Sequence, residues 1–270
     1  MKSIERPPKD LVQPFRDFGT ATISSALREV CGILRHSLTG PVAFTPGLKA
    51  VGTAVTLSFM AKREDVIAGH AEEEQEKRSA LWSAVIATQD GDVLVVDARG
   101  NMQTGCLGAM LMTSIHAKGT RGLVVDGCIR DLPEARDLGL PLFLRGATPH
   151  NAGHFEMYPW DYNVPITCGG ILIMPGDIIV ADDDGVVVVP PKVAPQVIEY
   201  CLAREGREVF ERINLAETGD IEKYYPLNEE GQREYDEWRR KFLQRDSPFP
   251  SLTSSSSKTG ARSSSNVTAP

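Results

Sequence analysis

Short apolar runs rich in β-branched residues alternate with helical patterns between residues 91 and 134. The runs at 93–96 and 123–125 have the length and composition of buried strands. Apolar residues between 107 and 115 recur at helical spacing, and this helix is expected to end near Gly119. Asp131-Leu132-Pro133-Glu134 opens a further helix with the spacing of a capping box. Strand, helix, strand, helix is the order of an α/β layer, so we predict an α/β fold.

The rest of the chain adds elements on both sides of this layer. Helices are predicted at 22–30, at 64–87, from 192 to about 216 and at 229–243, and strands at 51–60, 178–180 and 186–189. We expect an N-terminal arm at 1–19, one domain at 20–215, a helical extension at 216–246 and a disordered serine-rich tail at 247–270.

Composition narrows the class of protein. The net charge of −7, with no basic stripe, argues against a nucleic-acid binder. No apolar run approaches the ~18 residues that a membrane-spanning helix needs, so no membrane partner is expected. The five cysteines are scattered without a close pair, which favours neither a disulfide framework nor a thiolate zinc site. A reducing, cytoplasmic location is therefore expected.

An adjacent cation and carboxylate, Arg130 and Asp131, follow the apolar run Gly-Leu-Val-Val-Asp-Gly-Cys-Ile. The planar fork of Arg130 can hold a carboxylate or a carbonyl oxygen, and Asp131 can hold a hard metal ion. Open α/β sheets bind ligands at this end of their strands. Upstream, the turn 104–108 precedes a helix, so its free amides favour an anion. The alternative interpretation is a surface ion pair in which Asp131 caps its own helix.

Other polar residues are weaker candidates. His150 and His154 are four apart and could add a base or a metal ligand, or they are two solvated loop histidines. Asp97, Arg99 and Asn101 follow a strand, near the same presumed pocket. Asp182-Asp183-Asp184-Gly185 is interpreted as a turn between two strands. Cys106 and Cys128 flank the site and are interpreted as small packing residues.

Four motifs together resemble the RraA-like superfamily, which includes 4-hydroxy-4-methyl-2-oxoglutarate aldolases, oxaloacetate decarboxylases and RraA regulators of ribonuclease E. They are Gly91-Asp92-Val93-Leu94-Val95-Val96-Asp97, Gly105-Cys106-Leu107-Gly108, Gly119-Thr120-Arg121-Gly122-Leu123-Val124-Val125-Asp126-Gly127-Cys128-Ile129-Arg130-Asp131 and Pro175-Gly176-Asp177-Ile178-Ile179-Val180-Ala181-Asp182-Asp183-Asp184-Gly185-Val186. The resemblance implies a swivelling-type β/β/α domain with a central mixed sheet flanked by helices. It also implies homotrimers or homohexamers with sites at subunit boundaries.

The resemblance further implies roles for individual residues. Arg130 would bind the carboxylate and oxo group of a pyruvyl unit, and Asp131 would ligate Mg²⁺ or Mn²⁺, partly through waters. Amides of Gly105, Cys106, Leu107 and Gly108 would bind the pyruvyl end. Two positions depart from the pattern of the relatives. Ala109, twenty-one positions before Arg130, replaces an aspartate that helps to orient metal-bound water, and Ser25 stands where relatives often carry an aspartate.

Three hypotheses follow for function. The first is a metal-dependent lyase that cleaves a C–C bond of a small 2-oxo acid, by retro-aldol cleavage or decarboxylation through a pyruvate enolate. The second is a non-catalytic regulator of the RraA type that binds a ribonuclease. The third is a dehydratase or tautomerase that uses the same enolate chemistry.

Overall fold

The computed structural model describes residues 2–67, 79–152 and 156–243. Its chain divides into two compact units, Met1–Leu202 and Ala203–Pro270. Three predictions fall outside the described residues: the middle of the helix expected at 64–87, the role of His154, and the serine-rich tail. No helix within the described ranges is both long and apolar enough to cross a membrane.

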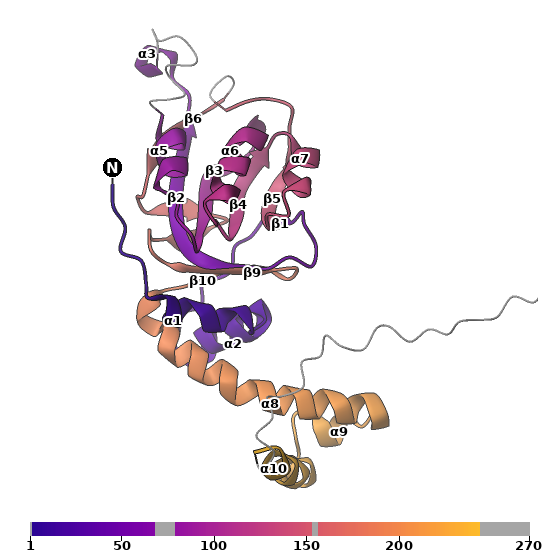
Figure 1. Cartoon of the computed structure of the whole chain (residues 1–270). Coiled ribbons are helices and arrows are strands. Elements are labelled where there is room, and N and C mark those ends of the chain that lie inside the picture. The colour runs from indigo at the N-terminus through magenta and orange to yellow at the C-terminus, as the bar shows by residue number, and fades with distance from the viewer. Residues whose placement is uncertain (1, 68–78, 153–155, 244–270) are drawn as a thin grey trace, which may run out of the picture. The chain divides into compact units, whose positions relative to one another are not determined.

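The first unit is built on an eight-stranded mixed sheet, shown in Figure 1. The strand order is β1-β5-β4-β3-β2-β9-β10, and β6 pairs with β2. Strands β2, β3, β4 and β5 run parallel to one another, whereas β1, β6, β9 and β10 pair antiparallel with their neighbours. Strands β7 and β8 form a separate hairpin. The bounds are β1 (Val42–Ala43), β2 (Ala50–Ala61), β3 (Asp92–Gly105), β4 (Gly122–Ile129), β5 (Leu142–Ala147), β6 (Met157–Tyr162), β7 (Ile166–Cys168), β8 (Ile171–Ile173), β9 (Ile178–Asp182) and β10 (Gly185–Val189).

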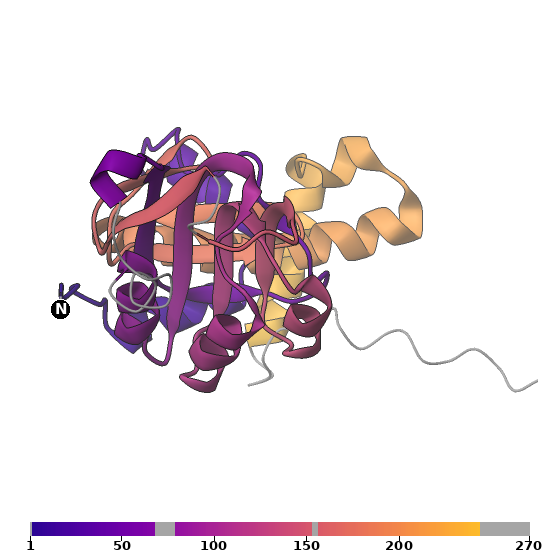
Figure 2. The ribbon, with the colours of Figure 1, turned by 90° about the horizontal axis from the view of Figure 1, so that it is seen from above.

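Three helices cover one face of the parallel strands, as Figures 1 and 2 show: α5 (Ala80–Ala87), α6 (Ala109–Ala117) and α7 (Leu132–Asp137). Leu81, Met112 and Ala135 from these helices pack on Leu94 and Leu123 of the sheet, and all five are buried. The opposite face of β3 and β4 is covered in part by the β7–β8 hairpin. Because both faces are buried, these strands are continuous apolar runs rather than alternating ones.

The antiparallel strands β9 and β10 carry a third apolar cluster. Helix α2 (Thr20–Glu29) packs there, together with the first turns of α8 (Ala194–Thr218) and with Phe15. The remaining elements of this unit are short: α1 (Lys9–Val12), α3 (Glu64–Ile67) and the 3-10 turns Gln13–Arg16 and Pro191–Val193. The predicted α/β class, central mixed sheet and flanking helices are confirmed.

The second unit contains the end of α8 with α9 (Ile221–Tyr224) and α10 (Glu229–Leu243). Phe210, Tyr224 and Tyr235 are buried together, with Trp238 against them. Lys223 bonds both Glu230 and Glu234, at 2.8 and 2.9 Å. The helices predicted from 192 to about 216 and at 229–243 are present.

The connections of the parallel strands position the candidate site. Helix α6 joins β3 to β4, and α7 joins β4 to β5, so the carboxyl ends of β3 and β4 meet at the same edge of the sheet. Strand β3 is longer than the run predicted at 93–96. It bends where Arg99 and Gly100 adopt left-handed backbone conformations, with φ of 56° and 71°, and its register with β4 shifts there.

Candidate functional site

The predicted cation and carboxylate lie where β4 ends and α7 begins. Arg130 follows β4 directly, and Asp131 is the residue before the first turn of α7. Asp131 has a left-handed backbone with φ of 59°, which is uncommon for a residue other than glycine and aims its side chain away from its own helix. Backbone strain of this kind persists only where the surrounding structure fixes it.

The two side chains lie beside each other at the surface. Arg130 Nε is 3.6 Å from Asp131 Oδ2, and the side chains are 43% and 41% exposed. An ion pair this exposed contributes at most about 1 kcal/mol to folding. This ion pair therefore contributes little to the stability of the fold. Both side chains remain accessible to a ligand.

The carboxylate of Asp131 also reaches α6. Its Oδ2 accepts a hydrogen bond of 2.9 Å from the amide of Ala109, the first residue of that helix. The capping box expected at Asp131 is wrong, since the side chain makes no capping hydrogen bond to α7. Instead, the side chain accepts a hydrogen bond from the N-terminus of α6, a helix that precedes Asp131 in the chain. Ala109, a position that departs from the aldolase pattern, is thus a direct neighbour of Asp131.

Two glycines allow the loop before α6 to approach this pair. A Cβ on Gly108 would lie 2.7 Å from Arg130 Nε and 2.8 Å from Asp131 Oδ2. A Cβ on Gly105 would lie 2.3 Å from the carbonyl oxygen of His150 and 3.1 Å from Arg130 Cβ. Any larger residue at either position would push Arg130 or its neighbours away. The glycine turn and Arg130 therefore form one packed arrangement.

Some backbone amides of this loop donate hydrogen bonds within the protein, and others remain available to a ligand. The Cys106 amide donates to the carbonyl of Cys128 over 2.8 Å, and the Leu107 carbonyl accepts from the Arg130 amide over 3.0 Å. Cys106 is thereby removed from the predicted ligand donors. Among the described residues, the amides of Leu107 and Gly108 have no acceptor. They precede the positive end of the α6 dipole, where an anion is favoured.

The possible metal ligands around Asp131 fit a magnesium site and not a zinc site. The described part of the chain contains no cluster of three or more His, Cys, Asp or Glu side chains that could hold an ion. A zinc site, which needs three or four such ligands, does not fit. Magnesium commonly binds through one or two carboxylates, with waters and substrate oxygens filling the remaining positions. A single half-exposed carboxylate beside Arg130 fits that pattern.

The histidine and cysteine candidates have structural partners. The Nδ1 atom of His150 lies 3.0 Å from the carbonyl of Gln103, just before the glycine turn. Cys106 and Cys128 are fully buried. Burial raises the pKa of both thiols above the usual range, so they stay protonated at neutral pH. The interpretation of both as packing residues is supported.

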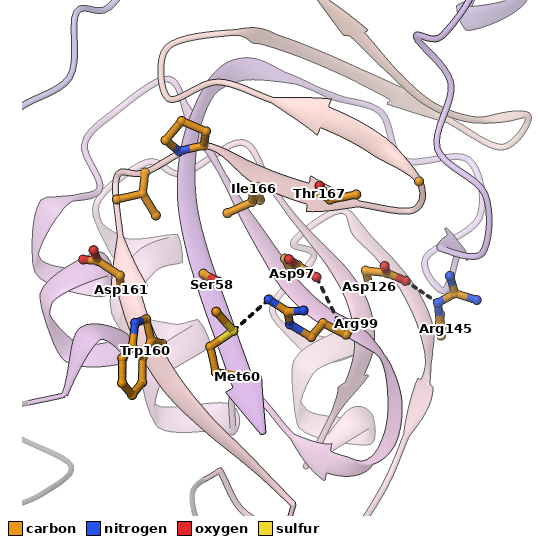
Figure 3. Close-up of a pocket in the computed structure, with 13 residues that line it drawn as sticks. Ser58, Met60, Asp97, Arg99, Asp126, Arg145, Trp160, Asp161, Ile166 and Thr167 are labelled. Atoms are coloured by element: carbon orange, nitrogen blue, oxygen red, sulfur yellow. Dashed lines mark hydrogen bonds and ion pairs between the residues drawn. The ribbon is translucent and has the colours of Figure 1, made fainter. Parts of the chain in front are cut away.

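Asp97 and Arg99 lie in a different place from the one expected. They line a cleft of about 550 Å³, with Asp126, Arg145 and Trp160, and neither Arg130 nor Asp131 lines it (Figure 3). Asp97 and Asp126 are register partners on β3 and β4, and both face the β7–β8 hairpin side. Sequence reasoning placed Asp97 and Arg99 near one presumed pocket with Arg130. The structure separates the two sets. Asp182-Asp183-Asp184 forms the turn between β9 and β10, as predicted.

Several known proteins resemble this chain over the α/β unit. The crystal structure of Streptomyces coelicolor RraAS2 is described as an unusual member of the RNase ES inhibitor RraA protein family. It is 44% identical, covers 78% of this chain and 99% of its own, and superposes with a TM-score of 0.71. An uncharacterized protein from Pseudomonas syringae is 25% identical, covers 82% of this chain and 98% of its own, and has a TM-score of 0.67.

A relative from Halalkalibacterium halodurans carries the name "Putative 4-hydroxy-4-methyl-2-oxoglutarate aldolase". It is 36% identical over 127 residues, which is 47% of this chain and 60% of the relative. The chain therefore spans about 60% of the length of this curated relative. A model of the RraA-like family, described as Aldolase/RraA, matches residues 20–188. The chain belongs to the RraA-like family.

Proposed function

We propose that this protein is a divalent-metal-dependent lyase that cleaves a C–C bond of a small 2-oxo acid. One observation carries the proposal: Arg130, Asp131 and the N-terminus of α6 converge on one point at the carboxyl ends of β3 and β4. A guanidinium, a carboxylate and free amides are the groups that a chelated 2-oxo acid requires. The relative from H. halodurans, whose name includes an aldolase activity, supports the same class of reaction.

Each residue has a role in binding the substrate. The fork of Arg130 would hold the substrate carboxylate through paired N–H donors. The amides of Leu107 and Gly108 would face the oxygen on which negative charge develops when the C–C bond breaks. These donors are fixed in place before the reaction, because Gly108 packs directly against Arg130 and Asp131.

Asp131 is the residue that would hold Mg²⁺ or Mn²⁺. When bound, the ion supplies a Lewis acid that polarises the 2-oxo group and stabilises the enolate. Asp131 Oδ2 is held by the Ala109 amide, so the carboxylate keeps a fixed orientation toward Arg130. Such outer hydrogen bonds orient the carboxylate ligands of metal sites.

Of the two cleavage reactions, we favour decarboxylation. Retro-aldol cleavage requires a base that removes the proton of the substrate hydroxyl as the C–C bond breaks. Decarboxylation of a 2-oxo acid such as oxaloacetate releases CO₂, leaves the bonding electrons on the enolate, and needs a proton only afterwards. Position 109, which contacts Asp131 directly, carries an alanine and supplies no carboxylate for such a base.

A direct comparison of substrates tests the proposal. Pyruvate release is followed from oxaloacetate and from 4-hydroxy-4-methyl-2-oxoglutarate in the presence of Mn²⁺ or Mg²⁺. We expect faster turnover of oxaloacetate, and R130Q should raise KM by about tenfold or more because a charge-assisted contact is lost. R136Q, which changes an exposed arginine on α7, is the matched control. Turnover no faster than the metal alone would reject the lyase.

A second function, inhibition of a ribonuclease, is favoured by one specific observation. The S. coelicolor relative, described as an unusual member of the RNase ES inhibitor RraA protein family, is 44% identical and is covered over 99% of its length. The regulator would act by binding the enzyme, without the chemistry of Arg130 and Asp131. Stoichiometric inhibition of an RNase E-type ribonuclease that is equal for the wild type, R130Q and D131N, with no pyruvate formed, would support the regulator over the lyase.

A further inference from the structure

We propose that the cleft lined by Arg99, Ser58 and Trp160 is a second ligand site, which binds a small aromatic carboxylate. The cleft has a volume of about 550 Å³, within the range of small-molecule sites. It is separate from the proposed lyase site. Asp126 of β4 lines it, whereas Arg130 lies four residues further on, just past the end of β4, and does not line it.

Two arginines line the cleft, and in the described part of the chain one of them, Arg99, makes no ion pair. Arg145 is paired with Asp126, and Asp161 with Lys2. Asp97 is 4% exposed, and its Oδ1 accepts the Arg99 amide over 2.9 Å. Burial raises the pKa of Asp97, and the amide and charge of Arg99 oppose this rise. Among the described residues, Arg99 has no ion pair: Nε donates to the Phe59 carbonyl over 3.0 Å, and Nη2 contacts Met60 Sδ at 2.7 Å.

Arg99 therefore offers a charge and free donors to an anion. A guanidinium has five N–H donors, and most of those of Arg99 have no acceptor among the described residues. The backbone of Arg99 is held at φ 56°, a left-handed conformation that costs an ordinary residue free energy. Because the carboxylate of Asp97 accepts the Arg99 amide, it stabilises this turn and keeps the guanidinium in the cleft.

A second polar group points to the same ligand. Ser58 on β2 is only 9% exposed and lines the cleft, yet within the described ranges its hydroxyl makes no hydrogen bond. Its oxygen is not among the fully buried, unpartnered polar atoms of the described residues, so it faces the open space of the cleft. A carboxylate oxygen that reached both Ser58 and Arg99 would satisfy this donor.

Beside Arg99, the cleft is lined by several apolar side chains. Trp160 on β6 and Met60 on β2 lie side by side in Figure 3, and they are 52% and 36% exposed. Val164 and Ile166 extend this apolar lining. Indole rings and thioethers both make favourable contacts with aromatic rings. A planar apolar group on this lining and a carboxylate on Arg99 together describe an aromatic acid.

The full chain titrated with benzoate tests the site. Binding is read from quenching of Trp160 fluorescence, with W160F subtracted because the chain has three tryptophans, and from a rise in Tm. We expect benzoate to bind, benzamide, its neutral analogue, to bind far more weakly, and acetate, which lacks the ring, likewise. R99Q should weaken benzoate binding by about tenfold or more, because a charge-assisted contact is lost.

Two further variants keep the test decisive. S58A removes only an unpaired hydroxyl, so it should fold normally and still weaken benzoate binding. R136Q should bind like the wild type, because this arginine also donates to a backbone carbonyl but lies outside the cleft. Equal binding of benzoate to the wild type, R99Q and S58A would overturn the site, as would no binding at all. Quenching that occurs only after dilution has dissociated the chain would show instead that a second copy covers this face.

Discussion

The amide of Ala109 donates a hydrogen bond of 2.9 Å to Oδ2 of Asp131, across twenty-two positions of the chain. The same oxygen lies 3.6 Å from Nε of Arg130. One carboxylate oxygen thus joins the start of α6 to the end of β4. Helix α6 carries its positive end toward this oxygen. The candidate site is rigid because these contacts come from two adjacent strand–helix junctions.

Restoring a carboxylate at position 109 should strengthen metal binding. In A109D the new side chain begins beside Asp131, so a second oxygen ligand becomes available to a hard cation. We expect the affinity for Mn²⁺ to rise by about tenfold, measured by the metal-dependent increase in Tm. Cleavage of 4-hydroxy-4-methyl-2-oxoglutarate should rise relative to decarboxylation of oxaloacetate.

M110D is the matched control for this change. Met110 is 84% exposed on the same first turn of α6, so it adds the same charge near the helix N-terminus at a neighbouring position. If M110D raised the Mn²⁺ affinity as much as A109D, a general charge effect would explain the gain, and Asp131 would have no special relation to position 109.

The close approach of Gly108 predicts a sensitive position. In G108A the added methyl group would lie 2.7 Å from Arg130 Nε, so the guanidinium must move. We expect a loss of about 1–3 kcal/mol in the free energy of unfolding, measured in urea. The KM for oxaloacetate should also rise. G19A, where an added Cβ meets nothing within 4 Å, should change neither quantity appreciably. Unchanged kinetics in G108A would contradict the packed arrangement.

The buried carboxyl of Asp97 predicts a pH-dependent stability. Burial raises its folded pKa above the unfolded value of about 3.9. The folded state therefore keeps this proton at a pH where the unfolded chain has lost it. Its contribution to stability is present below the unfolded pKa and is lost as the pH rises through the folded pKa. D97N should gain stability relative to the wild type as the pH rises from about 4 to 7, measured by urea unfolding.

Asp90 supplies a control of opposite sign. Hydrogen bonding to Lys9, with the charge of Arg121, lowers the pKa of Asp90. The wild type should therefore be more stable than D90N at neutral pH, and this difference should vanish as the pH falls through the folded pKa. The same pH trend in both variants would contradict the assignment for Asp97.

Much of the fold could be predicted because the parallel strands are buried on both faces. The apolar runs at 93–96 and 123–125 lie within the first halves of β3 and β4. The extension of β3 to Gly105 was missed, because the strand continues through polar residues and bends at Arg99. Strand β6 was missed because it contains Pro159 and several polar residues, and its pairing with β2 is a tertiary contact.

The site was predicted only in part, because some of its contacts are tertiary and leave no local pattern in the sequence. Arg130 and Asp131 are consecutive in the sequence, so their proximity could be predicted. The hydrogen bond from Ala109 depends on α6 and α7 starting at the same edge of the sheet. Local spacing alone indicated a capping box at Asp131. The left-handed backbone of this residue directs the side chain elsewhere. Asp97 and Arg99 were recognised as polar residues at a strand end, but the bend in β3 turns them toward another cleft.

Pyruvate release from oxaloacetate, followed while Mn²⁺ is titrated into wild type, D131N and D137N, tests the central claim most directly. D131N keeps the size of the side chain and removes the charge that would hold the metal, and D137N makes the same change at an exposed position of α7. We predict saturable, Mn²⁺-dependent turnover by the wild type and D137N, and a loss of at least about a hundredfold in D131N. Equal turnover by all three proteins would contradict the role of Asp131.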